Sequence, residues 1–274
     1  MSRKKRDIPV FDYPIVETHC HLDYLKDAEL VEVLANAQAI GVERVVTIAV
    51  SPDNLGRVRE LVADHETVYG TQGIHPHDAE KYLPETGVEI RQHGRDKGIV
   101  AIGEIGLDYF YDHADRAVQR RVFAEQLAIA CELDQPVVIH TREADADTQA
   151  ILKEYAPQLA RKGVIHSFTS GLPLAEFCLE QGFMLGFNGI ITFNKAENVR
   201  EVLAATPLNQ LVVETDSPYL TPAPYRGREN EPKYLPFIIE KVADVKGVSV
   251  SEVLQQSREN AYRLFGWSLT AQAG

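Results

Sequence analysis

The sequence contains few cysteines, a single tryptophan and no apolar run long enough to span a bilayer. Its three cysteines, Cys20, Cys131 and Cys178, are odd in number and widely spaced. This argues against a disulfide framework and favours a reducing compartment. The missing apolar run excludes a membrane-embedded class of protein. We therefore expect a cytoplasmic protein with no membrane partner.

The start of the chain lacks the apolar stretch that a signal peptide requires. Residues 2–6 are rich in Lys and Arg, but acidic residues and prolines follow directly. A basic start without an apolar continuation is not a secretory signal. We expect residues 1–13 to form a flexible, basic N-terminal tail.

Positive charge is also scarce, because 28 Lys and Arg face 40 Asp and Glu, a formal net charge of -12. Non-specific affinity for nucleic acid comes from cations that neutralise phosphates, so the composition excludes a general DNA-coating protein. A protein of this charge that acts on nucleic acid must rely on bound metal ions and a few local cations. It should then bind nucleic acid weakly once the metal is removed.

Length and patterning predict one α/β domain. The 274 residues carry no composition break or repeat, and a single barrel commonly reaches about 250 residues. Short β-branched apolar runs alternate with segments of helical periodicity, which is typical of βα units and a parallel sheet. The sequence does not reveal the oligomeric state, so a monomer is the default. We expect strands at Ile15–His19, Arg44–Ala49, Val68–Gly73, Ile99–Gly103, Pro136–His140, Val164–His166, Met184–Phe187 and Leu211–Glu214.

About eight strands is the number of a TIM-type (β/α)8 barrel. A doubly wound open sheet is the alternative, but no G-x-G-x-x-G follows the first strand. For the last helix, Ser251 is a candidate cap. Helical periodicity is found at Glu29–Ala39, Asn54–Asp64, Arg116–Leu133, Leu172–Glu180, Pro232–Lys246 and Ser249–Phe265.

Reactive side chains fall at the C-terminal ends of these predicted strands, where barrels of this type have their active sites. Because side chains alternate along a strand, the first two histidines share one face and Cys20 points to the other. Each residue alone could be a satisfied core or turn residue, but their shared position favours a metal site. The set is His19, His21, Glu104, His140, His166 and Asp216.

Two carboxylates in this set predict hydrolytic chemistry. Glu104 has glycines on both sides, which permit close backbone approach and a sharp turn. Its carboxylate could bridge two cations about 3.5–4 Å apart, with His140 and His166 completing the second ion. Asp216 could bind a metal and accept a proton from an attacking water, although an Asp before Pro218 also suits a β-turn.

Further residues are candidates for contact with the substrate or for ordering the metal ligands. The arginines could bind phosphate through two parallel hydrogen bonds. Tyr109 and Phe110 could stack on a base, with core packing as the alternative. The candidates are His75, His77, Arg142 and Arg226.

In this order, the segments resemble the TatD family of metal-dependent deoxyribonucleases, within the amidohydrolase-like group of barrels. The matching segments are Thr18 to Asp23, Gly73 to His77, Gly103 to Tyr109, Ile139 to Arg142, His166 to Phe168 and Thr215 to Leu220.

The resemblance implies metal-binding roles for His19, His21, Glu104, His140, His166 and Asp216. It implies exonuclease-type cleavage supported by Mg²⁺ or a similar ion, and makes Arg226 with residues 230–232 a substrate-side loop.

Three residues depart from the family pattern. Glu17 stands where Asp is usual, Ser170 is inserted before Gly171, and Glu229 occupies a position that is often basic. The last two bear on phosphate binding and substrate preference.

The leading hypothesis is a two-metal deoxyribonuclease that hydrolyses phosphodiester bonds of DNA, single-stranded or at ends. Mg²⁺ is the expected ion, with Mn²⁺ or Zn²⁺ as alternatives, because imidazole with carboxylate suits all three. The alternative hypothesis is an amidohydrolase or phosphotriesterase acting on a small molecule, since fold and metal ligands do not fix the substrate.

Overall fold

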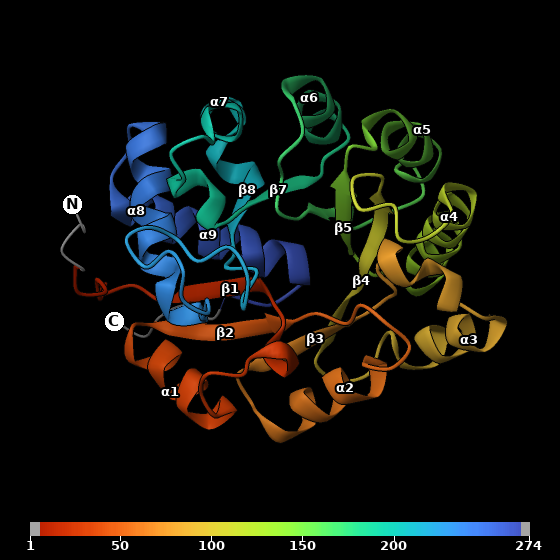
Figure 1. Ribbon diagram of the computed structural model, residues 1–274, viewed down its shortest axis with the longest axis horizontal. Helices are drawn as coiled ribbons and strands as arrows, with labels where there is room; N and C mark the ends of the chain where they lie inside the picture. Colours follow the sequence, from red (N-terminus) through yellow and green to blue (C-terminus); the bar gives the residue numbers. More distant parts are fainter. Residues whose placement is uncertain (1–5, 270–274) are drawn as a thin grey trace.

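Eight parallel strands form an inner ring, and helices cover its outside (Figure 1). This computed structural model describes residues 6–269. The strands pair in chain order, as the (β/α)8 prediction requires. They are β1 (Ile15–Cys20), β2 (Val42–Thr47), β3 (Val68–Gln72), β4 (Ile99–Asp108), β5 (Val137–Arg142), β6 (Gly163–Ile165), β7 (Met184–Phe187) and β8 (Leu211–Val213).

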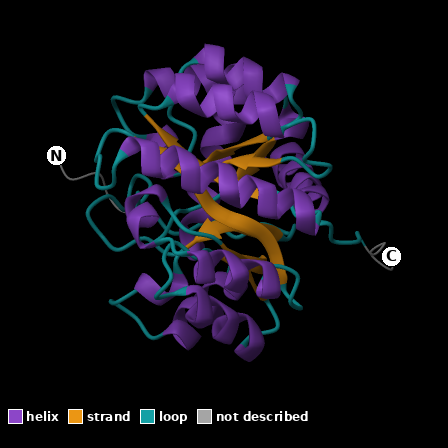
Figure 2. Ribbon diagram, turned by 90° about the vertical axis from the view of Figure 1, so that its right-hand side faces the viewer, coloured by secondary structure: helices purple, strands orange, loops and turns teal. Residues whose placement is uncertain are grey.

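The helices enclose the strands from several sides, as the turned view in Figure 2 shows. None of the helices in the described range combines the length and the apolar composition that a bilayer crossing needs. The helices are α1 (Leu30–Ala39), α2 (Leu55–Asp64), α3 (Pro84–His93), α4 (Arg116–Leu133), α5 (Asp145–Tyr155), α6 (Leu172–Glu180), α7 (Glu197–Ala205), α8 (Leu235–Lys246) and α9 (Val250–Phe265).

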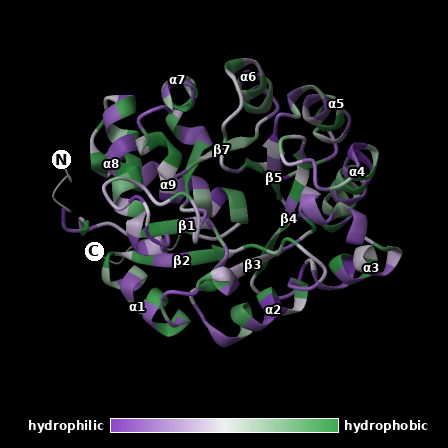
Figure 3. Ribbon diagram, in the orientation of Figure 1, coloured by the Kyte–Doolittle hydropathy of each residue, from purple (hydrophilic) through white to green (hydrophobic). Residues whose placement is uncertain are grey.

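Apolar side chains pack on both faces of the sheet, and Figure 3 shows hydrophobic stretches in the strands beside hydrophilic ones. Inside the ring, Val46, Val138 and Val212 share one cluster with Leu264 and Phe265 at the end of α9. Val138 is the second residue of β5 and Val212 the middle residue of β8, so α9 contributes to closing the end of the barrel away from the carboxyl ends of these strands. The candidate site residues lie at the opposite end, at the carboxyl ends of the strands.

The ring closes between β8 and β1 through bonds that involve the predicted site. The backbone N–H of Asp216 donates to the carbonyl of His19 at 2.9 Å, and that of His21 donates to the carbonyl of Ser217 at 2.8 Å. Thr18 Oγ1 also donates to the carbonyl of Val213 at 2.9 Å. Closure of the barrel therefore brings the first and last site segments together.

Three expectations differ from the structure. The fourth strand extends to Asp108, because residues beyond Gly103 continue to pair with β5. The last helix is capped by Ser249, not Ser251, in a capping box in which Ser249 and Glu252 bond each other's backbone N–H groups. The tail expected over residues 1–13 is packed in its second part, where Ile8 and Phe11 lie against the core, and residues 1–5 lie outside the described range.

Asn260 of α9 holds the helix to the segment that leads into and begins β8. Its buried Nδ2 donates to the carbonyls of Leu208 and Leu211 at 2.9 and 2.7 Å. We expect Asn260→Ala to lower the free energy of unfolding by about 2 to 4 kcal/mol, because two inward carbonyls lose their donor. Urea unfolding measures this. Gln255→Ala, on the exposed face of the same helix, should change the value by less than about 0.5 kcal/mol.

Candidate metal centre

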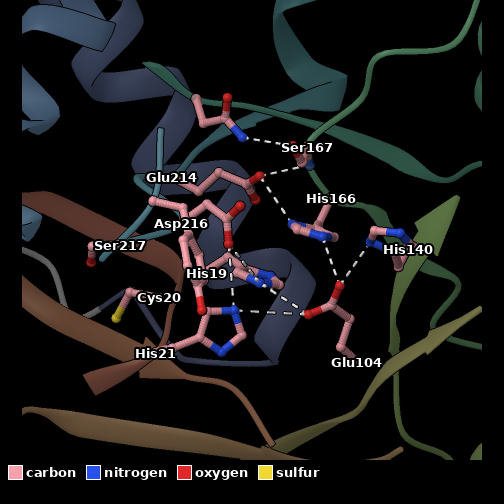
Figure 4. Close-up of polar contacts among 12 residues, drawn as sticks. His19, Cys20, His21, Glu104, His140, His166, Ser167, Glu214, Asp216 and Ser217 are labelled. Carbon is pink, nitrogen blue, oxygen red and sulfur yellow. Dashed lines mark hydrogen bonds and ion pairs between the residues drawn. The ribbon is translucent and has the colours of Figure 1, made fainter. Parts of the chain in front are cut away.

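His19 and His21 reach the barrel mouth from the end of β1. Both side chains are buried, and their Nε2 atoms turn toward the same two carboxylates. Cys20, between them, points away, and its thiol donates to the carbonyl of Val46 at 3.5 Å (Figure 4). The alternation of side chains expected from the sequence therefore holds at this strand end.

Glu104 lies at the middle of the centre, with different imidazoles facing its two oxygens (Figure 4). Oε2 lies 3.4 Å from His19 Nε2 and 4.0 Å from His21 Nε2. Oε1 lies 2.9 Å from His166 Nε2 and 3.0 Å from His140 Nδ1. A carboxylate with ligand groups on both oxygens has the arrangement required to bridge two cations.

Glycines let β4 carry this carboxylate into the ring. The register between β4 and β5 shifts between Gly103 and Ile105. A Cβ on Gly73 would lie 2.5 Å from the backbone of Gly103, and one on Gly106 would lie 1.9 Å from the carbonyl of His140. The close approach expected around Glu104 is therefore present, but within a continuing strand and not at a sharp turn.

Asp216 completes the side of the centre that faces Glu104 Oε2. Its Oδ1 lies 3.4 Å from His21 Nε2 and 3.5 Å from His19 Nε2. The residue has φ of 57°, in the left-handed region that Asp tolerates better than most residues. The side chain of Asp216 is 14% exposed, whereas those of His19 and His21 are 1% and 6% exposed.

Several buried imidazole nitrogens lack a partner in hydrogen-bond geometry among the described residues. They are both ring nitrogens of His19, both of His166 and Nδ1 of His21. Carboxylate oxygens lie within 3.5 Å of some of them, yet without that geometry. Buried polar atoms are otherwise nearly always bonded, so converging, unpaired nitrogens beside carboxylates fit metal coordination.

Three groups of side chains in the described range have potential ligand atoms within 4.8 Å of one another. They are His19 with His21 and Glu104, His19 with His166 and Glu214, and His75 with Glu104 and His140.

The carboxylates and imidazoles of the centre shift one another's pKa values. Burial alone would raise the pKa of Glu104, but His166, His75 and His140 outweigh it and hold that pKa well below its usual range. Burial lowers the pKa of His166, whereas Glu104 and Glu214 raise it more, so the net pKa is well above the usual value. The carboxylate of Glu104 thus stays ionised and can neutralise positive charge in the centre.

Two further carboxylates, for which the sequence alone predicted no role, hold the histidines in place. Asp108 Oδ2 lies 2.8 Å from His140 Nε2 and 3.2 Å from His77 Nε2. Glu214 Oε1 lies 3.3 Å from His166 Nδ1 and accepts the backbone N–H of Ser167 at 2.6 Å. The position of Asp108 could have been predicted from the sequence. It follows Glu104 by four residues, and the alternation of side chains along a strand puts both on one face of β4.

The four substrate candidates lie in different surroundings. His75 Nε2 is 3.4 Å from Glu104 Oε1, so His75 is part of the centre itself. His77 contacts it through Asp108, 3.2 Å from its Nε2, and through His75, whose Nδ1 accepts the backbone N–H of His77 at 3.1 Å. The guanidinium of Arg142 lies 3.8 Å from the ring centre of Phe110, and that of the exposed Arg226 lies 3.4 Å from the ring centre of Phe193. No contact ties Arg226 to the histidines and carboxylates in the described range.

The three departures from the family pattern have structural partners. Glu17 is buried and accepts the hydroxyl of Thr215 at 2.6 Å, and burial raises its pKa to about 8. Ser170 donates to Asp145 at 2.8 Å, beside the start of α5. Glu229 accepts the backbone N–H groups of residues 26 and 27 at 2.9 Å each, which ties the loop after β8 to the loop after β1.

Asp108→Asn should weaken metal binding by about 10- to 100-fold, because the charged acceptor that orients His140 is lost. The amide oxygen can still accept the N–H groups of Phe110 and Tyr111, so the loop should stay in place. Calorimetric titration of the metal-free protein with Mn²⁺ measures the change. Asp112→Asn is the matched control, because Asp112 is exposed in the same loop and pairs only with Arg116 within the described residues. Equal affinities for the two variants would contradict the assigned role of Asp108.

Known proteins match this chain over nearly its whole length. The family described as TatD related DNase matches residues 16–266. YcfH of Escherichia coli, an uncharacterized metal-dependent hydrolase, is 39% identical over 257 residues, covering 92% of this chain and 95% of that protein. The 3'-5' ssDNA/RNA exonuclease TatD of Erwinia tasmaniensis is 34% identical, covering 88% of this chain and 95% of its own.

A solved structure has the same fold. The TatD homologue YjjV of Escherichia coli superposes with a TM-score of 0.87 at 31% identity, and the match covers 93% of this chain and 98% of that one. The fold, the converging histidines and carboxylates, and these matches agree. The chain belongs to the TatD family of metal-dependent hydrolases.

Proposed function

We propose that this chain hydrolyses phosphodiester bonds of DNA, in single strands or at strand ends, with two divalent ions held at the barrel mouth. The observation that carries the proposal is Glu104, whose two oxygens face separate sets of imidazoles. His19, His21 and Asp216 would hold one ion, His140 and His166 the other, and Glu104 both. Every one of these side chains comes from a single chain, so a monomer suffices.

A phosphodiester is favoured over an amide by the charges around the mouth. Arg142 and Arg226 are ion-paired with no carboxylate among residues 6–269, and each guanidinium lies on an aromatic ring. Such cations can bind phosphate oxygens through parallel hydrogen bonds. The relative from Erwinia tasmaniensis is named as an exonuclease on single-stranded DNA and RNA, which supports the same substrate class.

The chain's own side chains divide the chemistry. When bound, Mg²⁺ or a similar ion lowers the pKa of water and stabilises negative charge on phosphate oxygens. Asp216 would accept the proton of the attacking water, and Glu104 would hold both ions. Asp108 and Glu214 keep His140 and His166 oriented. Arg142 would bind a phosphate oxygen.

Removal of divalent ions should lower cleavage of a labelled single-stranded oligonucleotide by at least about 100-fold, because charge stabilisation and water activation are lost together. Activity should return with Mg²⁺ or Mn²⁺, and Zn²⁺ is tested beside them. Binding of the oligonucleotide should fall too, since the chain has a net charge of -12. A parallel screen of ester, amide and phosphotriester substrates tests the alternative. Turnover there with intact DNA would overturn the proposal.

A further inference from the structure

Exposed aromatic side chains in the described range occur only at the barrel mouth. Phe110 is 49% exposed, Tyr111 50% and Tyr219 52%, whereas the other Phe, Tyr and Trp side chains of residues 6–269 are less exposed. Phe110 and Tyr111 follow β4, and Tyr219 follows β8. Apolar rings held in water next to a reactive centre are typical of ligand contacts.

Tyr219 lies on the side of the centre that faces Glu104 Oε2. Its ring centre is 6.2 Å from that of His21, edge to face. Its backbone N–H donates to the carbonyl of Asp216 at 2.9 Å, and its carbonyl accepts Asn230 Nδ2 at 2.6 Å. The backbone is therefore fixed while half of the side chain faces solvent.

Phe110 and Tyr111 lie on the other side, which faces Glu104 Oε1. Their backbone N–H groups donate to Asp108 Oδ1 at 3.1 and 2.8 Å, and the other oxygen of that carboxylate holds His140. The ring centre of Tyr111 is 5.3 Å from that of His77. One carboxylate thus sets both the exposed rings and a residue of the metal centre, so their spacing is fixed.

Arg142 adds a cation to this second side. Its guanidinium carbon lies 3.8 Å from the ring centre of Phe110 and 4.8 Å from that of Tyr111. The guanidinium is ion-paired with no carboxylate in the described part of the chain, so it keeps its hydrogen-bond donors for an anion. Tyr109, in contrast, already has partners within the protein. Its hydroxyl donates to Asp147 at 2.5 Å, and the guanidinium of Arg116 lies over its ring.

We propose that Tyr219 on one side and Phe110 with Tyr111 on the other are base-stacking surfaces flanking the metal centre, and that they select unpaired nucleotides. This inference rests on the proposed nuclease function and names the substrate contacts of that same site. Every base has a π face, so the contact tolerates any sequence. Bases in a duplex are already stacked and must be opened first, which costs free energy. Arg142 binds a phosphate beside the Phe110 and Tyr111 rings.

Two substitutions, Tyr111→Leu and Tyr219→Leu, test the proposal, because leucine keeps an apolar side chain and removes the flat ring. The substrates are a labelled single-stranded oligonucleotide, the same strand with abasic residues on both sides of the cleaved bond, and a blunt duplex. Each variant should lower kcat/KM for the normal single strand by roughly 5- to 150-fold. The abasic strand should be cleaved equally by the variants and the unmodified protein, and the preference for single strands over duplex should shrink.

Matched variants separate stacking from other effects. Tyr111→Phe and Tyr219→Phe retain the rings and should retain kcat/KM within about threefold. Val88→Ala removes an exposed apolar side chain on α3 and should leave all rates unchanged. Thermal unfolding checks that each variant is folded.

The outcomes are distinct. If the single strand is cleaved and the leucine variants match the unmodified protein, or lose as much activity on the abasic strand, the stacking proposal is overturned and the nuclease function stands. If the unmodified protein cleaves no oligonucleotide with Mg²⁺ or Mn²⁺, both proposals are overturned.

Discussion

Glu104→Gln should lower kcat/KM for metal-dependent phosphodiester hydrolysis by about 10³- to 10⁴-fold. The amide keeps the size of the side chain but removes the charge that lies within 3.4 Å of imidazoles on both sides. It also replaces one acceptor oxygen with a donor, so it cannot offer two equivalent oxygens to two cations. Both ions, and with them the spacing of the centre, should be weakened together.

Metal content distinguishes this loss from general damage. Elemental analysis after equilibration with Mn²⁺ should give two ions per chain for the unmodified protein and fewer for Glu104→Gln. Glu43→Gln is the control, because Glu43 pairs with Arg258 of α9, away from the histidines and carboxylates of the centre. That variant should keep its activity even if its stability falls. Unchanged rates for Glu104→Gln would remove the bridging carboxylate from the mechanism.

The order and approximate position of the strands could be predicted because each contains a short apolar run, β-branched in most of them, and helical segments separate these runs. The end of β4 could not, because its glycines are equally typical of a turn. Gly106 has φ of 141° inside the strand, next to the carbonyl of His140. Only the partner strand decides between the two uses of glycine, and pairing with β5 continues to Asp108. The capping box at Ser249, by contrast, is local and could have been found from Glu252 three residues later.

The candidate site could be predicted in part from one rule, the strand-end rule, which states that active sites of such barrels lie at the C-terminal ends of the strands. That rule brings together His19, Glu104 and Asp216, which are far apart in the sequence, and the structure places them in contact distance. It does not say which carboxylates orient histidines, since Asp108 and Glu214 lie beside the ligand candidates and differ from them only in where their oxygens point. The rule also does not predict which arginines contact the substrate. Arg142 is placed by the pairing of Asp108 with Arg142 at the end of β5, whereas Arg226 lies in a loop without regular structure.

Asp216→Asn should lower kcat by about 10²- to 10⁴-fold while KM changes by less than about threefold. Burial alone would raise the pKa of Asp216, but His21, His166 and His19 outweigh it and the net pKa is lowered, so the carboxylate is ionised and can accept a proton. Asparagine keeps one oxygen at that position as a ligand but cannot accept the proton of the attacking water. Its side chain can also rest in the left-handed backbone that this position requires, where φ is 57°.

Metal content again decides what the loss means. If Asp216→Asn retains both ions and its kcat falls, the substitution has slowed proton transfer. If an ion is lost in proportion to activity, Asp216 acts as a ligand and another group accepts the proton. Asp244→Asn, on the exposed face of α8 where Asp244 pairs with Lys241, should leave kcat and metal content unchanged. A kcat for Asp216→Asn equal to that control would exclude the side chain from both roles, because neither a ligand nor a proton acceptor can be neutralised without effect.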